Sequence, residues 1–235
     1  MTNPDSKADI RKHLAATVFG ALGEPALEES CYAARIERFK VPTLLSAAGE
    51  QPQYLRLVVS GHIEVIARNA SGVEFAVGYI TPGGWATWLA CFMESPPDND
   101  FYCSASACFV TLPVQEVRHL CATYPQIYPL IIRQIGRRMR LLMEWTGQSV
   151  LVDSVQRVAK LLHILAREQQ VQAGYAKLNV TQARVATLAR CSRQTANEIL
   201  GVLEQKGLLT LAYGSVEIPD LRRLATFADA GPHEQ

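Results

Sequence analysis

Polar side chains that can read DNA bases gather in the stretch CSRQTANEILGVLEQKG, residues 191–207. They are Arg193, Gln194, Thr195, Asn197 and Glu198. In the major groove, arginine bonds guanine through two hydrogen bonds, glutamine and asparagine do the same with adenine, and glutamate accepts from cytosine. The competing interpretation is the solvated face of an ordinary amphipathic helix. The elements predicted on either side of the stretch distinguish a DNA-reading face from a merely solvated one.

The apolar residues of this stretch recur at helical spacing and predict one buried face, made of Ala196, Ile199, Leu200 and Leu203. Ser192 is the expected N-cap of the helix, and Gly207 is the expected stop. A shorter helix is expected after a second N-cap, Thr181, with a tight turn at residues 190–192 between the two helices. Two short helices joined in this way form a helix-turn-helix, whose second helix enters the major groove.

The segment LLTLAYGSVEI, residues 208–218, follows the second helix. It contains two alternating runs around Tyr213 and Gly214, which predicts a β-hairpin. A helix pair with such a hairpin is a winged helix, a more specific pattern than a helix pair alone. The context therefore favours a DNA-reading face over a merely solvated one.

The segment between residues 35 and 112 has a different pattern, with short apolar runs that alternate with polar residues. Turn residues separate the runs at Ser60–Gly61, Ser71–Gly72 and Pro82–Gly83–Gly84. This pattern predicts an antiparallel β domain of barrel or jelly-roll type.

A long helix is expected after Pro125 and Pro129. Its apolar stripe consists of Ile131, Ile135, Leu142 and Trp145, with a polar interruption at Arg138. Two interpretations stay open. The helix packs on its own β domain, or the stripe is a coiled-coil dimer seam that tolerates Arg138.

Bulk composition indicates an ordinary cytoplasmic protein without a membrane partner. The 235 residues are 49% hydrophobic, carry a net charge of +1 and contain no run of about 20 apolar residues. The six cysteines lack the close spacing of metal or redox motifs, which favours reduced thiols. We find no GxSxG, P-loop, HExxH or GxGxxG motif and therefore expect no enzyme.

The stretch TQARVATLARCSRQTANEILGVLEQKGLL, residues 181–209, resembles the Crp/Fnr family of bacterial transcription regulators, and the likeness spans nearly the whole chain. It implies an α+β fold with a helix and an antiparallel β-roll of the cyclic-nucleotide-binding type at residues 1–124. A dimerisation helix and hinge at 125–152 and a winged helix-turn-helix at 153–235 would follow. The implied partners are a near-palindromic operator in double-stranded DNA, a second copy of the chain and RNA polymerase.

The resemblance also assigns roles within the DNA-binding domain. It implies phosphate contacts from Thr181, Ser192 and Thr195 and base contacts from Arg193, Gln194 and Glu198. The full set expected at the DNA is Thr181, Gln182, Ser192, Arg193, Gln194, Thr195, Asn197 and Glu198. The cyclic-AMP receptor branch has Arg, Glu and Arg at the three base-reading positions, so a different half-site is expected here.

The cyclic-nucleotide signature of the family is altered in this chain. Trp88 stands where the family has glutamate, and Asp98–Asn99 where it has an Arg-Ser pair. Leu142–Met143 replaces the Thr-Ser pair that touches the nucleotide base. An aspartate beside the cyclic phosphate would repel it, so a cyclic-nucleotide effector is not expected.

Large apolar residues occupy or flank these altered positions: Trp85, Trp88, Phe92, Leu142, Met143 and Trp145. If they line a pocket, it suits a hydrophobic or aromatic molecule, or haem. The alternative is that the aromatic residues fill the former pocket as core and that no ligand binds.

No cofactor or metal is expected. Cys31 is the only cysteine before Cys91, which excludes an iron–sulfur cluster held by closely spaced N-terminal cysteines. Haem stays a candidate, with His62, His119 or a cysteine as axial ligand. The functional alternatives are a ligand-binding or protein-interaction β-roll and, least favoured, a cupin-like enzyme, for which only His62 and Glu64 resemble ligands.

Overall fold

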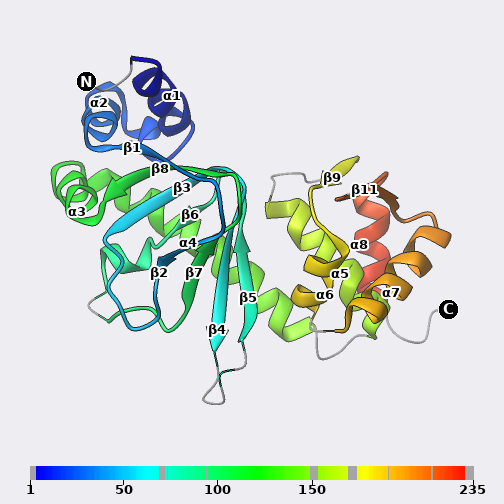
Figure 1. Ribbon diagram of the computed structural model, residues 1–235. Helices are drawn as coiled ribbons and strands as arrows, with labels where there is room; N and C mark the ends of the chain where they lie inside the picture. Colours follow the sequence, from blue (N-terminus) through cyan, green and yellow to red (C-terminus); the bar gives the residue numbers. More distant parts are fainter. Residues whose placement is uncertain are drawn as a thin grey trace. The chain divides into compact units, whose positions relative to one another are not determined.

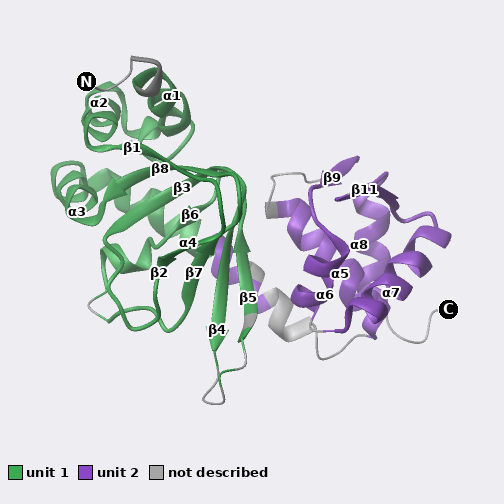
Figure 2. Ribbon diagram, viewed as in Figure 1, with its two compact units in different colours: residues 1–136 green, residues 137–235 purple. Residues whose placement is uncertain are grey.

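The computed structural model describes residues 4–68, 72, 74–93, 95–148, 153–168, 174–189, 191–212 and 214–230. The chain divides into two compact units, residues 1–136 and 137–235 (Figure 2). Helix α4 (Tyr128–Gln148) contributes residues to both. None of the helices in the described ranges is long and apolar enough to cross a membrane. Several predicted features lie outside the described residues: Ser71, the Trp145 side chain, the hinge around 150–152, Arg190 and Tyr213.

Unit 1 contains a β-roll of two four-stranded antiparallel sheets (Figure 1). One sheet has the order β1-β8-β3-β6 and the other β2-β7-β4-β5. The strands are β1 (Arg35–Phe39), β2 (Thr43–Ser46), β3 (Tyr54–Ser60), β4 (Ile63–Arg68), β5 (Glu74–Ile80), β6 (Trp85–Ala86), β7 (Asp100–Cys103) and β8 (Ala107–Pro113). The antiparallel β domain predicted from alternation is therefore confirmed.

The turn predicted at Gly61 joins β3 to β4, and the backbone there requires glycine. Its φ is +75°, in the left-handed region. An added Cβ would lie 2.7 Å from Ser104 Oγ and 2.9 Å from the Ala107 Cα. A side chain at position 61 would therefore collide with Ser104 and with Ala107, the first residue of β8.

Unit 1 has two apolar cores, and the side chains of β3 contribute to both. Leu55 and Leu57 face the helical layer, where they join Phe19 and Val110. Val58 faces the interior of the roll, together with residues such as Ile63 and Phe109. The helical layer consists of α1 (Pro4–Ala15), η1 (Gly20–Leu22), α2 (Glu24–Ala33), η2 (Leu89–Cys91), α3 (Val114–Thr123), η3 (Pro125–Ile127) and the start of α4. Both faces of the β1-β8-β3-β6 sheet are thus covered.

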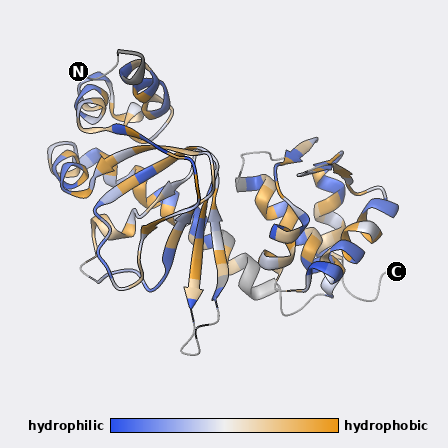
Figure 3. Ribbon diagram, viewed as in Figure 1, coloured by the Kyte–Doolittle hydropathy of each residue, from blue (hydrophilic) through white to orange (hydrophobic). Residues whose placement is uncertain are grey.

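In the described part of unit 2, the helices α5 to α8 and a small sheet pack around one core. The helices are α5 (Ser154–Glu168), α6 (Gln182–Ala189), α7 (Arg193–Gln205) and α8 (Leu221–Asp229). Hydrophobic and hydrophilic residues intermingle along them (Figure 3), as in amphipathic helices that share a core. The predicted hairpin is present as β10 (Thr210–Ala212) and β11 (Ser215–Ile218), and β9 (Ala176–Leu178) pairs with β11 to make a third strand.

Helix α8 has no counterpart among the predicted elements. Asp220 caps it by accepting hydrogen bonds from the backbone N–H groups of Arg222 and Arg223. The buried side chains of Leu221, Leu224 and Ala228 recur at helical spacing. Lys160 of α5, which is 4% exposed, donates to Asp229 Oδ1 at 2.7 Å and ties the end of α8 to the core.

Candidate nucleic-acid interface

The helix-turn-helix predicted from the sequence is formed by α6 and α7. Helix α6 ends at Ala189 and α7 begins at Arg193. In the turn, the Cys191 N–H donates to the Ala186 carbonyl oxygen at 3.0 Å. The predicted stripe of α7 is buried against α5 and α6, because Ala196, Leu200 and Leu203 are 0% exposed and Ile199 is 5% exposed. The opposite face of α7 is thereby held toward solvent.

Ser192 is the N-cap of α7, as predicted. Its Oγ accepts a hydrogen bond from the Thr195 N–H at 3.0 Å and lies 2.8 Å from Thr195 Oγ1. Thr181 performs the same task for α6, where its Oγ1 accepts from the Arg184 N–H at 3.2 Å. Two of the three predicted phosphate contacts, Ser192 and Thr181, therefore lie at helix N-termini, where backbone dipoles favour anions.

The predicted base-reading residues lie together on the first two turns of α7. Arg193, Gln194, Asn197 and Glu198 are all exposed. Gln194 Nε2 donates to Glu198 Oε1 at 3.1 Å, the spacing of one helical turn. Arg193 makes no ion pair within the described part of the chain, so its guanidinium is available. Gln182 is half-buried at the start of α6, and Thr195 is half-buried beside the cap.

The wing is attached to α7 by contacts that the sequence did not indicate. Glu204 Oε1 accepts a hydrogen bond from the Leu211 N–H of β10 at 2.8 Å. Across the sheet, Lys177 of β9 donates to Glu217 of β11 at 2.8 Å. The hydrogen bond and charge of Lys177 lower the pKa of Glu217. The Glu204 bond therefore holds the hairpin against α7, and the Lys177–Glu217 pair joins β9 to β11 within the sheet.

Trp85 and Trp88, predicted as pocket residues, are buried in an apolar core of unit 1. They are 7% and 6% exposed, with ring centroids 5.4 Å apart. Phe19 packs on both, edge-on to Trp85 at 5.6 Å and stacked on Trp88 at 6.1 Å. This packing agrees with the alternative that they fill the core. Phe19 was missed because nothing in a short apolar run such as Val18–Phe19 indicates which sheet face it covers.

The other residues of the predicted pocket that the structure describes are exposed. Phe92 is 41% exposed and contacts the Tyr128 ring at 5.9 Å. Leu142 and Met143 are exposed on α4, at 53% and 63%. The Trp145 side chain lies outside the described residues.

The backbone before Trp88 is strained. Thr87 has φ +73°, which a β-branched residue rarely adopts. The Thr87 hydroxyl donates to the Tyr54 carbonyl oxygen at 2.7 Å, which holds the strained turn in place.

The arginine buried in the described part of the β-roll is already paired. Arg56 is 7% exposed, and its Nε donates to Glu37 Oε2 at 3.2 Å. Arg35 and Thr111 also donate to Glu37, at 2.7 and 3.0 Å. Burial raises the pKa of Glu37, but the Arg35 hydrogen bond, the Arg56 charge and the Thr111 hydroxyl outweigh it, so the pKa is lowered. Arg56 is thus committed to a carboxylate rather than free for a phosphate.

Part of the predicted dimer seam needs correction. Ile131 is 2% exposed in the core of unit 1, and Ile135 packs against the same core. The first turns of α4 therefore pack on their own β-roll, which was the alternative interpretation. The exposed apolar residues are Ile132, Met139, Leu142 and Met143, at 66%, 59%, 53% and 63%. Arg138 is half-buried beside them.

The candidate metal and redox residues have other contacts. No three His, Cys, Asp or Glu side chains among the described residues are placed to hold a metal ion. His62 pairs with Glu64 and His119 with Glu29, each at 3.3 Å. All six cysteines are free thiols. Burial raises the pKa of Cys91 to about 12 and that of Cys121 to about 11, which keeps both thiols protonated at neutral pH.

Comparison with known proteins agrees with this architecture. Residues 36–124 match the model of the cyclic nucleotide-binding domain, and residues 156–227 match the Crp-like helix-turn-helix domain. The cAMP-activated global transcriptional regulator CRP of Salmonella typhimurium is 24% identical over 190 residues, which cover 80% of this chain and 90% of that protein.

Solved structures share the fold. FixK2 from Bradyrhizobium japonicum superposes with a TM-score of 0.71 at 14% identity, over 84% of this chain and 98% of that one. The c-di-GMP responsive global regulator CLP of Xanthomonas campestris gives 0.62 at 21%, over 82% and 97%. The relatives are regulators and not enzymes. Because both domain models match in the order β-roll then helix-turn-helix, the chain belongs to the Crp/Fnr family of bacterial transcription regulators.

Proposed function

We propose that this transcription regulator acts in the cytoplasm as a homodimer and reads its operator through the exposed face of α7. The observation that carries the proposal is the placement of Arg193, Gln194 and Glu198 on the first two turns of a helix whose other face is fully buried. A recognition helix enters the major groove with this end first. Arg193 would bond guanine, and Gln194 with Glu198 would select neighbouring base pairs.

Phosphate contacts would orient α7 in the groove. Ser192 and Thr181 cap two helices whose N-termini face the same ligand in a docked helix-turn-helix. Such contacts position the domain without selecting sequence. Thr195, Gln182 and Asn197 would add polar contacts around them.

The dimer would form along the exposed face of α4. The 3-4-3 spacing of coiled-coil a and d positions is followed by exposed Ile132, Met139 and Leu142 together with Ile135, which is half-buried and also packs on the core of unit 1. This seam differs from the one expected from the sequence, because Ile131 is buried in its own unit and Ile132 is exposed. In the new register Arg138 flanks the seam rather than interrupting it. Two copies related by a two-fold axis would read a near-palindromic operator.

The signal is proposed to be something other than a cyclic mononucleotide. Trp88 is buried in an aromatic core, Asp98 is exposed where the family has arginine, and Arg56 is paired with Glu37. A hydrophobic ligand, or no ligand in the roll, fits these residues better. Members of the fold respond to different molecules, since CRP is described as cAMP-activated and CLP as c-di-GMP responsive. RNA polymerase is the further partner that family membership suggests.

Selection from a random-sequence duplex pool tests the DNA-reading function. We expect the full chain to enrich a near-palindromic motif whose binding weakens as salt concentration rises. Gln205→Ala, at the exposed far end of α7, is the matched control and should enrich the same motif. If no motif is enriched by the parent chain, sequence-specific reading by α7 is wrong.

A further inference from the structure

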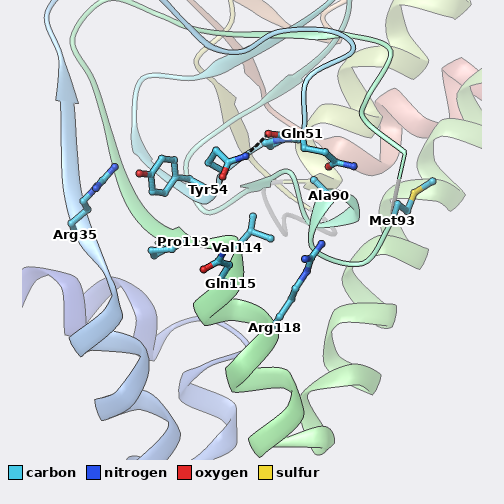
Figure 4. A pocket seen from close by; sticks show the side chains of 11 residues that line it. Arg35, Gln51, Tyr54, Ala90, Met93, Pro113, Val114, Gln115 and Arg118 are labelled. Carbon is cyan, nitrogen blue, oxygen red and sulfur yellow. Dashed lines mark hydrogen bonds between the residues drawn. The ribbon is translucent and has the colours of Figure 1, made fainter.

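We propose that unit 1 carries a binding site for a small organic carboxylate in a surface pocket beside the N-terminus of α3. The pocket has a volume of about 570 Å³, within the range of small-molecule sites. Figure 4 shows Arg35 and Tyr54 on one side of it and Arg118 and Met93 on the other, with Gln115 between. It is a different place from the aromatic core around Trp88, since neither tryptophan lines it.

The charges of the pocket favour an anion. Its lining contains two arginines, Arg35 and Arg118, and no Asp or Glu among the residues that the structure describes there. Arg35 shares Glu37 with Arg56, so one carboxylate faces two guanidinium groups. The Arg118 charge has no such partner in the described ranges. The local balance is positive.

Arg118 is oriented for recognition. Its Nε donates to the Cys91 carbonyl oxygen at 2.7 Å, which fixes the plane of the guanidinium group. The two terminal nitrogens make no hydrogen bond within the described part of the chain. A guanidinium edge of this kind matches the two oxygens of a carboxylate.

The remaining lining suits the body of an organic molecule. Met93, Val114 and Pro113 provide apolar surface, and the Gln115 and Gln53 amides provide hydrogen-bonding groups. The Val114 N–H is already bonded to the Gln53 carbonyl oxygen at 3.0 Å, so the α3 N-terminus is secured within the protein. Recognition would rest on side chains, chiefly Arg118 and Gln115.

The pocket is also connected to the start of α4 within unit 1. Met93 follows Phe92, whose ring lies 5.9 Å from the ring of Tyr128, the first residue of α4. A ligand that contacts Met93 would therefore contact the segment whose neighbouring residue, Phe92, packs on α4.

Ligand-observed NMR titration of the full chain tests the site. The probes are benzoate and glutarate, with neutral benzamide as the matched control molecule. We expect saturable binding of at least one carboxylate and binding of benzamide that is weaker by roughly tenfold or more. The result does not depend on DNA binding, so the site can fail while the proposed function stands.

Two variants locate the binding. Gln115→Glu places a negative charge in the pocket and should weaken carboxylate binding by about tenfold or more, while an acid in the first turn of α3 suits the helix. Gln134→Glu, an exposed position of α4 outside the pocket, should leave binding unchanged. Arg118→Lys keeps the charge but loses the planar edge, and should weaken binding as well. No saturable binding of either carboxylate to the parent chain, or equal binding by Gln115→Glu and Gln134→Glu, overturns the proposal.

Discussion

Gln194 Nε2 donates a hydrogen bond to Glu198 Oε1 across 3.1 Å on the exposed face of α7. One oxygen of the carboxylate is thereby occupied, and the amide is held in one orientation. If α7 reads DNA as proposed, the two side chains would meet the bases as a pair, although each has its own base preference.

The first prediction is that Gln194 and Glu198 are coupled in base selection. In a double-mutant cycle of Gln194→Ala and Glu198→Ala, the effects on operator binding should deviate from additivity by about 0.5–3 kcal/mol. The reason is that removing either residue frees or misorients the other. Gel-shift titrations against half-site variants measure the cycle, with Gln205→Ala as the same substitution at the far end of α7. Strict additivity would show that the hydrogen bond is lost on binding.

The second prediction separates reading from positioning at the start of α7. Arg193→Ala should weaken operator binding by about 1–3 kcal/mol and relax preference at one base pair. Ser192→Ala should instead weaken binding to all sequences alike.

Ser192→Ala has a second expected effect, because its Oγ accepts from the Thr195 N–H. Loss of this cap should lower the free energy of unfolding of unit 2 by about 1 kcal/mol. Urea titration of the DNA-free chain measures this change in the free energy of unfolding.

If the Arg193→Ala variant keeps the base preference of the parent chain, the assignment of Arg193 as a base-reading residue is wrong.

The DNA-binding unit was largely predictable because its signals are local. Caps at Thr181 and Ser192, the stripe from Ala196 to Leu203 and the stop at Gly207 all lie within one short stretch. Helical periodicity states which residues share a face, and here one face was entirely apolar. Helix α8 was not predicted although its cap, Asp220, is local, because the helix is short and begins directly after the strand β11.

Unit 1 was less predictable because its contacts join residues that are distant in sequence. Trp85 and Trp88 looked suited to a ligand, yet Phe19, more than sixty residues away, packs on both. The stripe of α4 was ambiguous for the same reason. Neighbouring isoleucines at 131 and 132 satisfy helical spacing equally well, and only the packing of the roll decides which is buried.

The third prediction concerns the dimer seam on α4. Met139→Glu should weaken self-association by about 2 kcal/mol or more, roughly a thirtyfold change in Kd, because the seam would bury two unpaired carboxylates. Met139 is 59% exposed in one chain, so the protomer should fold normally. Sedimentation equilibrium measures the association.

Gln134→Glu is the matched control for the seam, since it adds the same charge on an exposed position of the same helix outside the proposed 3-4-3 pattern. Ile131→Val should mainly lower the stability of unit 1, by about 1 kcal/mol, since Ile131 lies in its core. Equal self-association of Met139→Glu and Gln134→Glu would place the dimer interface elsewhere.

The fourth prediction is a pH dependence carried by Glu37. Its pKa is lowered in the folded chain because the contributions of Arg35, Arg56 and Thr111 outweigh burial. A carboxyl group with a lowered folded pKa stabilises the fold above its ordinary pKa, and this stability is lost as pH falls through the lowered value.

At about pH 7, Glu37→Gln should therefore lower the free energy of unfolding by about 1–3 kcal/mol, because it leaves buried Arg56 without its counter-charge. The difference from the parent chain should shrink as the pH falls through the lowered pKa of Glu37, because the parent carboxyl group then becomes protonated as well. Urea unfolding over a series of falling pH values measures it, with Glu50→Gln as a control at an exposed position. A stability difference that stays constant over the whole pH series would mean that the shape of the Glu37 side chain, and not its charge, stabilises the fold.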